Sequence, residues 1–311
     1  MAKIKLNTSI SLNDAFENFL LSKRAEGLSN KSITTYKGHL SCISHHLNIF
    51  QQLSNVNKSE IEEMINSMRK SNLSSNSIAS YVRTLKSFFS WAKSEGLTSL
   101  TIQKYKAEET VKETYTDEEL KKLLVKPNLN KCDFTEYRNW VIINFLLNSG
   151  ARSSTVRNIL IKDVDIQNAL IYYRHTKNKK AQVIPLCSQM VSILKEYLFY
   201  REGQENDYLF CSNVGGMLTS NALSHSIGKY NNRRGVQKTS IHLFRHTFAK
   251  KYLIDCGGDA FSLQRILGHS TLEMTRHYCN LYDADLLRNY DVYSPLQHLK
   301  PKEVRLSMKN K

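Results

Sequence analysis

The chain has 311 residues, of which 41% are apolar, so it is long enough for two domains of ordinary size and too apolar to be a disordered chain. Its formal net charge is +16 and is spread along the chain: residues 1–100 hold 12 Lys/Arg against 7 Asp/Glu, and the remainder holds 32 against 21. A basic excess distributed in this way favours a polyanionic partner, because each neutralised phosphate releases a counterion. Charge alone leaves open the alternative of a soluble protein whose surface is simply basic.

The sequence also argues against a membrane or secreted protein. Residues 1–6 lack the apolar core of a signal peptide, and no apolar run reaches membrane-spanning length. The six cysteines are dispersed and form no CxxC pair, which is typical of reduced thiols in a cytosolic protein. We therefore expect a cytoplasmic location and no membrane partner.

Residues 8–98 are predicted to form a helical domain of about four helices. Apolar residues recur there at helical spacing, and Ser11 is placed to cap the first helix, with Asp14 in its first turn. We expect the apolar stripes to form a core. The polar faces carry basic residues that either contact phosphate or are solvated: Lys31, Lys37, Arg83, Lys86 and Lys93.

Residues 99–115 lose this periodicity and are predicted to be a linker. A second domain is predicted over residues 116–290, followed by a tail over residues 291–311. It opens with Thr116 and, three positions later, Glu119, the pattern of a capping box before an apolar run.

The second domain is predicted to mix helices with a small β-hairpin. A strongly apolar helix over residues 137–147 is expected to be buried and to end at Gly150, and another helix is expected to continue through residues 156–160. Residues 169–173 and 182–186 are predicted to be two short strands joined by a basic turn, after which the pattern returns to helices.

Two arginines of this domain suit a phosphate ester. Arg152 follows the buried helix, and Arg245 lies in the segment His242-Leu243-Phe244-Arg245-His246-Thr247. A guanidinium binds two non-bridging oxygens through paired hydrogen bonds, which an ammonium does not. We therefore interpret both as a clamp on a scissile phosphate, although a salt bridge is the commoner role of an isolated arginine.

Two histidines accompany the arginines. His242 lies three residues before Arg245 at a predicted helix start, so both side chains can face one cleft. His269 follows Gly268, which suits a helix end that exposes the next side chain. A histidine can donate to a phosphate oxygen or move a proton near neutral pH, but a lone histidine is usually structural.

Tyr278 is the candidate nucleophile, because it follows the Gly-His segment. A phenol has a pKa near 10, and adjacent cations and a histidine lower the cost of ionising it. Lys177, in the basic turn, is the candidate that protonates a leaving 5′ oxygen. Lys179 and Lys180 compete for that role and are more simply read as contacts to backbone phosphates.

The sequence lacks the motifs that other reaction classes require. The sequence contains no HExxH or other standard zinc pattern, no GxxxxGK[ST] loop and no Gly-x-Ser-x-Gly elbow. We therefore expect no metal, no ATP and no other cofactor.

Taken together, these motifs resemble the tyrosine recombinase (phage integrase) family over essentially the whole chain. They are His242-x-x-Arg245-His246-Thr247, Leu267-Gly268-His269 followed by Tyr278, and Gly150-Ala151-Arg152. The resemblance places six residues in the family's functional positions: Arg152, Lys177, His242, Arg245, His269 and Tyr278.

The resemblance implies a mainly α fold with a small β-hairpin or sheet, arranged as a two-domain C-shaped clamp around duplex DNA. A helical core-binding domain (SAM-like) would precede a mixed α/β catalytic domain. Tyr278 would form a 3′-phosphotyrosyl link with a free 5′-hydroxyl, and four protomers would exchange strands through a Holliday junction. The protein would then be nucleoid-associated when bound to its specific sites, acting in integration, excision or resolution of DNA.

The sequence departs from the family at Thr155, three positions after the first arginine, where an acidic residue is usual. A carboxylate there would help orient the neighbouring groups. Its loss puts this support in doubt, but not the assignment of the catalytic residues. Two rival functions stay open. A type IB topoisomerase would share the nucleophile but rejoin the same strand, and a catalytically silent DNA-binding protein would form no covalent link.

Overall fold

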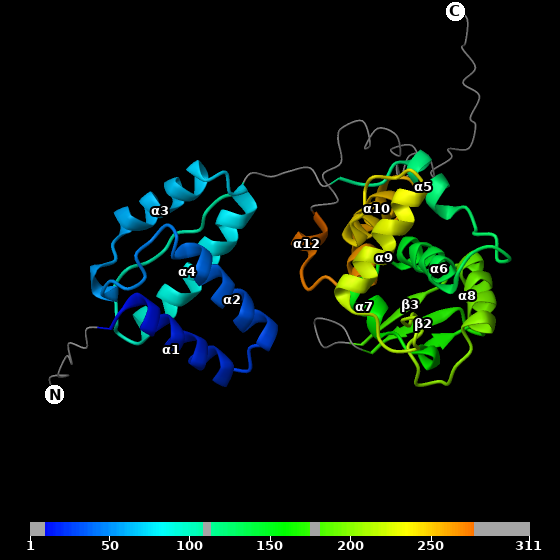
Figure 1. The fold of residues 1–311 in the computed structure, drawn as a ribbon, viewed down its shortest axis with the longest axis horizontal. Coiled ribbons are helices and arrows are strands. Elements are labelled where there is room, and N and C mark those ends of the chain that lie inside the picture. Colours follow the sequence, from blue (N-terminus) through cyan, green and yellow to red (C-terminus); the bar gives the residue numbers. More distant parts are fainter. Residues whose placement is uncertain (1–9, 108–112, 175–180, 277–311) are drawn as a thin grey trace, which may run out of the picture. The chain divides into compact units, whose positions relative to one another are not determined.

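The computed structural model describes residues 10–107, 113–174 and 181–276. The chain divides by its contacts into two compact units, Met1–Val111 and Lys112–Lys311, which are treated separately below. The described residues are mainly helical with one small sheet (Figure 1), which confirms the predicted mainly α class with a small sheet.

The first unit contains the four predicted helices. They are α1 (Leu12–Ala25), α2 (Asn30–Ile43), α3 (Lys58–Lys70) and α4 (Ser75–Ser94), with a 3₁₀ turn, η1 (Leu53–Asn55), before α3. The side chain of Ser11 accepts a hydrogen bond from the Asp14 amide, so the predicted cap of α1 is confirmed.

Aromatic side chains from α1 and α4 form the centre of the first unit's core. Phe16, Phe19 and Phe88 are fully buried, and their ring centroids lie 5.2–5.8 Å apart. Edge-on and tilted aromatic contacts at this distance add to the free energy gained from burial. The stripes at helical spacing are therefore core rather than binding surface, as predicted.

The second unit contains eight helices and three strands within the described residues. The helices are α5 (Asp117–Leu124), α6 (Phe134–Ser149), α7 (Ser153–Asn158), α8 (Ser188–Arg201), α9 (Ser220–Arg233), α10 (Ile241–Ile254), α11 (Ala260–Leu267) and α12 (Leu272–Arg276). A 3₁₀ turn, η2 (Ile161–Asp163), leads into the strands β1 (Val164–Asp165), β2 (Leu170–Tyr173) and β3 (Gln182–Pro185).

The sheet is antiparallel with strand order β1-β2-β3, and Ile171 pairs with Ile184. The two predicted strands are confirmed as β2 and β3, whereas β1 was not predicted. The helix predicted through residues 156–160 is wrong at its end. Helix α7 stops at Asn158, because Ile159 is extended and Leu160 pairs with Tyr208 in an isolated bridge.

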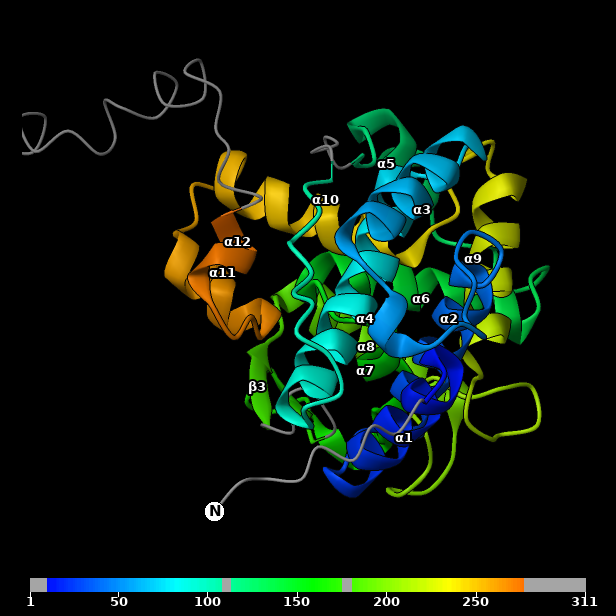
Figure 2. The same cartoon turned by 90° about the vertical axis from the view of Figure 1, so that its left-hand side faces the viewer.

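Helix α6 forms the centre of the second unit and is buried on all sides, as predicted from its sequence. It packs against α5, α8, α9 and α10, and Figures 1 and 2 show it among these helices. Arg152 therefore follows the end of the most deeply packed helix of this unit, which is a rigid support for a functional side chain.

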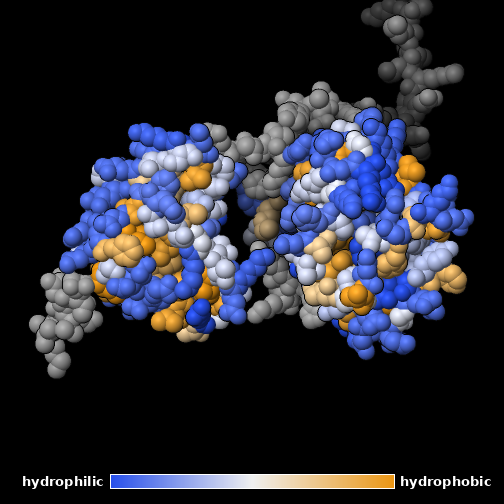
Figure 3. Space-filling view, viewed as in Figure 1, coloured by the Kyte–Doolittle hydropathy of each residue, from blue (hydrophilic) through white to orange (hydrophobic). Residues whose placement is uncertain are grey.

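In the view of Figure 3, the surface of each unit is mainly hydrophilic, and apolar residues form smaller patches within it. This distribution is ordinary for a folded domain whose large apolar side chains are in the core.

Gly150 ends α6 in the left-handed conformation, with φ +57°. A Cβ atom at this position would lie 2.5 Å from Cδ1 of Phe248 and 2.7 Å from Cδ2 of Leu267. We expect Gly150→Ala to lower the free energy of unfolding by about 1–2 kcal/mol because of the positive φ. The overlap of the new Cβ with Phe248 and Leu267 should lower it by about 1–3 kcal/mol more. Chemical denaturation of the purified protein measures the loss.

Gly96→Ala is the matched control for this prediction. Gly96 has φ +74°, but a Cβ atom at this position would have no neighbouring atom within 4 Å. Gly96→Ala therefore measures the cost of the positive φ without any overlap. Equal losses from the two variants would contradict the proposed overlap at Gly150.

Candidate active site

Arg245 lies on the first turns of α10 and is buried, with 7% of its surface exposed. Its Nη1 donates to the carbonyl oxygen of Gly150 (2.8 Å), and its Nη2 donates to that of Leu267 (2.9 Å). These oxygens lie at the C-terminal ends of α6 and α11, where helix carbonyls lack intrahelical partners and the dipole is negative. Two helix ends therefore compensate the buried positive charge and fix the plane of the guanidinium.

Arg152 approaches the same place from the start of α7. Its Nη2 donates to the carbonyl oxygen of Gly268 at 3.3 Å, one residue beyond the carbonyl that Arg245 contacts. The two arginines thus both bind the C-terminal end of α11, although they are 93 positions apart in sequence.

His242 lies close to both arginines. Burial lowers the pKa of His242 below its usual value of 6.5, and the positive charges of Arg245 and Arg152 lower it further. The imidazole is therefore neutral at neutral pH, and as a neutral ring it can donate one hydrogen bond and accept another.

This shift can be measured by following the His242 ring signals by NMR as the pH is changed. We expect a titration midpoint below 6.5. Because the unfolded chain then binds the proton more readily than the folded one, His242 lowers the unfolding free energy as the pH falls below about 6.5 and has no such effect above it. A His242→Gln variant identifies the signal, and a midpoint of 6.5 or higher would contradict the geometry.

His269 completes the group. Its Nε2 lies 2.9 Å from Nη2 of Arg245, and its Nδ1 lies 2.8 Å from Oγ1 of Thr275 on α12. Helix α11 ends at Gly268 with φ +60°, so the predicted helix end that presents His269 is confirmed. The role of Thr275 was not predicted, because a threonine six positions after a histidine, across a helix end, carries no signal of contact.

A side chain of the sheet also supports this helix end. Nε2 of Gln182 on β3 donates to the carbonyl oxygen of Arg265 at 2.5 Å. A Cβ atom on Gly268 would lie 2.5 Å from Oε1 of the same glutamine, so glycine permits the close approach. Sequence reasoning missed Gln182, which links the strand after the basic turn to the segment that carries His269.

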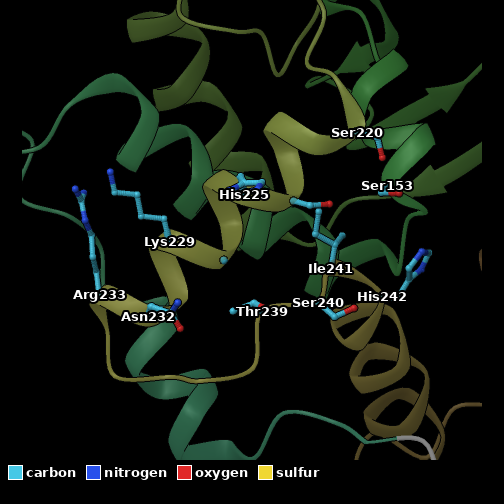
Figure 4. Close-up of a pocket in the computed structure, with 12 residues that line it drawn as sticks. Ser153, Ser220, His225, Lys229, Asn232, Arg233, Thr239, Ser240, Ile241 and His242 are labelled. Atoms are coloured by element: carbon cyan, nitrogen blue, oxygen red, sulfur yellow. The ribbon is translucent and has the colours of Figure 1, made fainter. Parts of the chain in front are cut away.

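A groove of about 930 Å³ begins at His242 and follows α9. In Figure 4, His225, Lys229 and Arg233 extend from one side of α9, and Ser240 and His242 come from the segment that opens α10. Every residue that lines the groove is basic, neutral polar, glycine or isoleucine, so the lining contains no carboxylate. Its chemistry suits an extended anion that reaches from His242 along the helix.

The structure thus brings together Arg152, His242, Arg245 and His269. Lys177 and Tyr278 lie outside the described residues, as do Lys179 and Lys180, so their predicted places are not described. Among the described residues, no group of three or more His, Cys, Asp or Glu side chains is arranged to hold a metal ion. No described helix is long and apolar enough to cross a membrane.

Comparison with known proteins decides the family. Residues 113–285 match the phage integrase family, and residues 14–96 match the N-terminal SAM-like domain of phage integrases. The chain belongs to the phage integrase family. It is therefore a tyrosine-type site-specific recombinase, a DNA strand transferase, which confirms the predicted family and activity and does not favour the rival functions.

Named relatives and solved structures agree with this placement. The chain is 29% identical to tyrosine recombinase XerC of Thermodesulfovibrio yellowstonii over 72% of its length and 77% of that protein. It is 26% identical to tyrosine recombinase XerD of Staphylococcus haemolyticus over 87% of its length and 94% of that protein. It shares its fold with the Tn1549 transposon integrase, with a TM-score of 0.76, 18% identity, and coverage of 92% of this chain and 100% of that one.

Within this phage integrase, Thr155 occupies the place where the sequence resemblance leads us to expect an acidic residue. It lies on α7 and is buried, with 5% exposed. Two backbone carbonyl oxygens nevertheless accept from the buried Arg245, so the described site does not depend on a carboxylate at residue 155 to compensate that guanidinium.

Proposed function

We propose that the four residues gathered at the end of α11 hold the scissile phosphate of a DNA strand, while Tyr278 attacks it and Lys177 protonates the leaving oxygen. The observation that carries this proposal is the convergence of two arginines and two histidines from three separate segments: the start of α7, the first turns of α10 and the residues after α11. In a protein of this family, such a cluster suits a phosphodiester, whose transition state gains negative charge.

The two arginines are proposed to bind the non-bridging oxygens. Arg245 is fixed by Gly150 and Leu267, and Arg152 by Gly268, so both guanidiniums are oriented before DNA binds. Preorganised donors stabilise the transition state without a cost of reorganisation, commonly by several kcal/mol.

The histidines are proposed to take different roles. His242 is neutral and close to both arginines, so its N–H can donate to a phosphate oxygen. His269 presents Nε2 as an acceptor toward Arg245, so this nitrogen can take the phenolic proton once the arginine donates to the phosphate instead.

In the proposed cleavage step, the Oη–P bond of Tyr278 forms while the P–O5′ bond breaks. The phenolic proton goes to His269, and the departing O5′ receives a proton from Lys177. The energy of the phosphoester is kept in the 3′-phosphotyrosyl link, and a 5′-hydroxyl of the partner strand reverses the step to complete exchange.

The groove along α9 is proposed to contact duplex DNA next to the cleaved phosphate. Its exposed basic residues His225, Lys229 and Arg233 continue from His242, and most of the affinity for DNA comes from phosphate contacts of this kind. The solved integrase structures that share this fold include complexes with DNA, among them a lambda integrase tetramer bound to a Holliday junction.

Because the chain belongs to this family, we propose that it forms a homotetramer on two synapsed sites. The mass of the complex on a synthetic four-way junction tests the assembly, and four copies per junction are expected.

We also propose that the protein is cytoplasmic and nucleoid-associated. The domain limits proposed from the sequence are residues 8–98 for DNA core binding and 116–290 for catalysis, with a linker over 99–115 and a tail over 291–311.

A recombination assay tests the function. Selection from a randomised duplex pool on the purified protein gives the bound site, and two copies in direct repeat are placed on a supercoiled plasmid. We expect excision of the intervening DNA, and no change to a plasmid without the sites. Relaxation of any supercoiled plasmid would instead support a topoisomerase, and binding without cleavage would support a silent DNA-binding protein.

A further inference from the structure

His269 makes a hydrogen bond through each of its ring nitrogens. Nε2 lies 2.9 Å from Nη2 of Arg245, and Nδ1 lies 2.8 Å from Oγ1 of Thr275. Thr275 has 0% of its surface exposed, so its hydroxyl is held in a packed position. The ring is therefore held between a charged side chain of α10 and a buried hydroxyl of α12.

The arginine determines which nitrogen carries the proton. A guanidinium has N–H donors and no acceptor, so Nε2 of His269 must offer its lone pair to Arg245. A neutral imidazole carries a single proton, which in this arrangement is on Nδ1. Nδ1 then donates to Oγ1 of Thr275, because a hydroxyl can accept as well as donate.

We propose that Thr275 is a positioning residue that holds His269 in the Nδ1–H tautomer. Without the threonine oxygen, the partly buried Nδ1–H would lose this acceptor, and leaving a donor away from water without its hydrogen bond is costly. Moving the proton to Nε2 would then place an N–H against the N–H of Arg245. The threonine hydroxyl thus keeps the lone pair of Nε2 on the side of the two arginines.

The position of Thr275 in the chain adds a second consequence. Thr275 lies in α12, whose described end is Arg276, and Tyr278 follows two positions later. The same hydrogen bond therefore ties this end of α12 to His269. As far as catalysis is concerned, the inference rests on the proposed function, since Nε2 must be unprotonated to accept the phenolic proton.

The tautomer can be observed directly in protein labelled with ¹⁵N-histidine. Long-range ¹H–¹⁵N spectra separate protonated from unprotonated ring nitrogens, and a His269→Gln variant identifies the signals of residue 269. We expect a protonated Nδ1 and an unprotonated Nε2 in the wild type and in Thr275→Ser, and loss of this pattern in Thr275→Val. A protonated Nε2 in the neutral wild-type ring would overturn the proposal, even if Thr275→Val failed to fold.

Cleavage kinetics supply the second measurement. On a duplex with a nick close to the scissile phosphate, we expect Thr275→Val to form the covalent adduct about 10-fold to 100-fold more slowly, by analogy with the loss seen when the hydrogen-bond partner of a metal-binding histidine is removed. Valine keeps the volume of threonine, and Thr275→Ser, which keeps the hydroxyl, should restore the rate. Thr271→Val, at an exposed position before α12, is the matched control and should cleave normally.

The two measurements separate the inference from the proposed function. If the wild type formed no adduct, the proposed function would fail, while the NMR spectra would still decide the tautomer. If Thr275→Val kept both the wild-type tautomer and the wild-type cleavage rate, Thr275 would not be a positioning residue.

Discussion

Tyr278→Phe is expected to abolish the covalent protein–DNA adduct and to leave DNA binding unchanged. Phenylalanine lacks the oxygen that attacks phosphorus, so no ester can form, whereas the affinity for DNA comes mainly from basic side chains at phosphates. The adduct is measured on denaturing gels with a nicked duplex that lets the cleaved fragment diffuse away. Binding is measured by a gel shift with the intact duplex.

Tyr252→Phe is a matched control for this prediction, because Tyr252 lies on α10 of the same unit and its ring packs against Phe248. It should form the adduct like the wild type. Mass spectrometry of the digested adduct should find the nucleotide on the peptide that contains residue 278. An adduct that persists in Tyr278→Phe would refute the choice of nucleophile.

Arg245→Lys is expected to slow cleavage by about 10²–10³-fold, the usual effect of removing one preorganised donor from a site of this type. Lysine keeps the charge but lacks the planar fork that can bind a helix end and a phosphate together. It also leaves at least one of the carbonyl oxygens of Gly150 and Leu267 without its donor, which costs about 1–3 kcal/mol of stability when the group stays buried.

The two effects of Arg245→Lys can be separated. Arg157→Lys is the control, because Nη1 of Arg157 also donates to a backbone carbonyl, that of Leu218, at 3.1 Å. We expect it to lose stability without a comparable loss of single-turnover cleavage at a temperature where both variants are folded. Wild-type cleavage by Arg245→Lys would exclude the proposed clamp.

The sequence predicted those parts of the fold that depend on local pattern. The helical period of residues such as Phe16 and Phe19 marked the core of the first unit, and Thr116 with Glu119 formed the expected capping box at the start of α5. Strand β1 escaped prediction because it has two residues, Val164 and Asp165, too few to show an alternation.

The candidate site could be predicted in its residue types but not in its contacts. Arginines and histidines in the right order indicated a phosphate-cleaving group, and the structure brings four of these residues together. Two acceptors of Arg245 are backbone oxygens, which leave no trace in a sequence. The contact between His269 and Thr275 depends on the turn between α11 and α12, whose path no local pattern determines.

The backbone oxygens that hold Arg245 also affect how the site responds to mutation. Every amino acid has a main-chain carbonyl, so no single substitution at residue 150 or 267 deletes an acceptor atom, as a change of Asp to Ala would in an ordinary ion pair. A genetic screen for lost activity should therefore recover no substitution at these two positions that acts by deleting the acceptor of Arg245. It should find instead replacements that displace a helix end, first of all those that add bulk at Gly150.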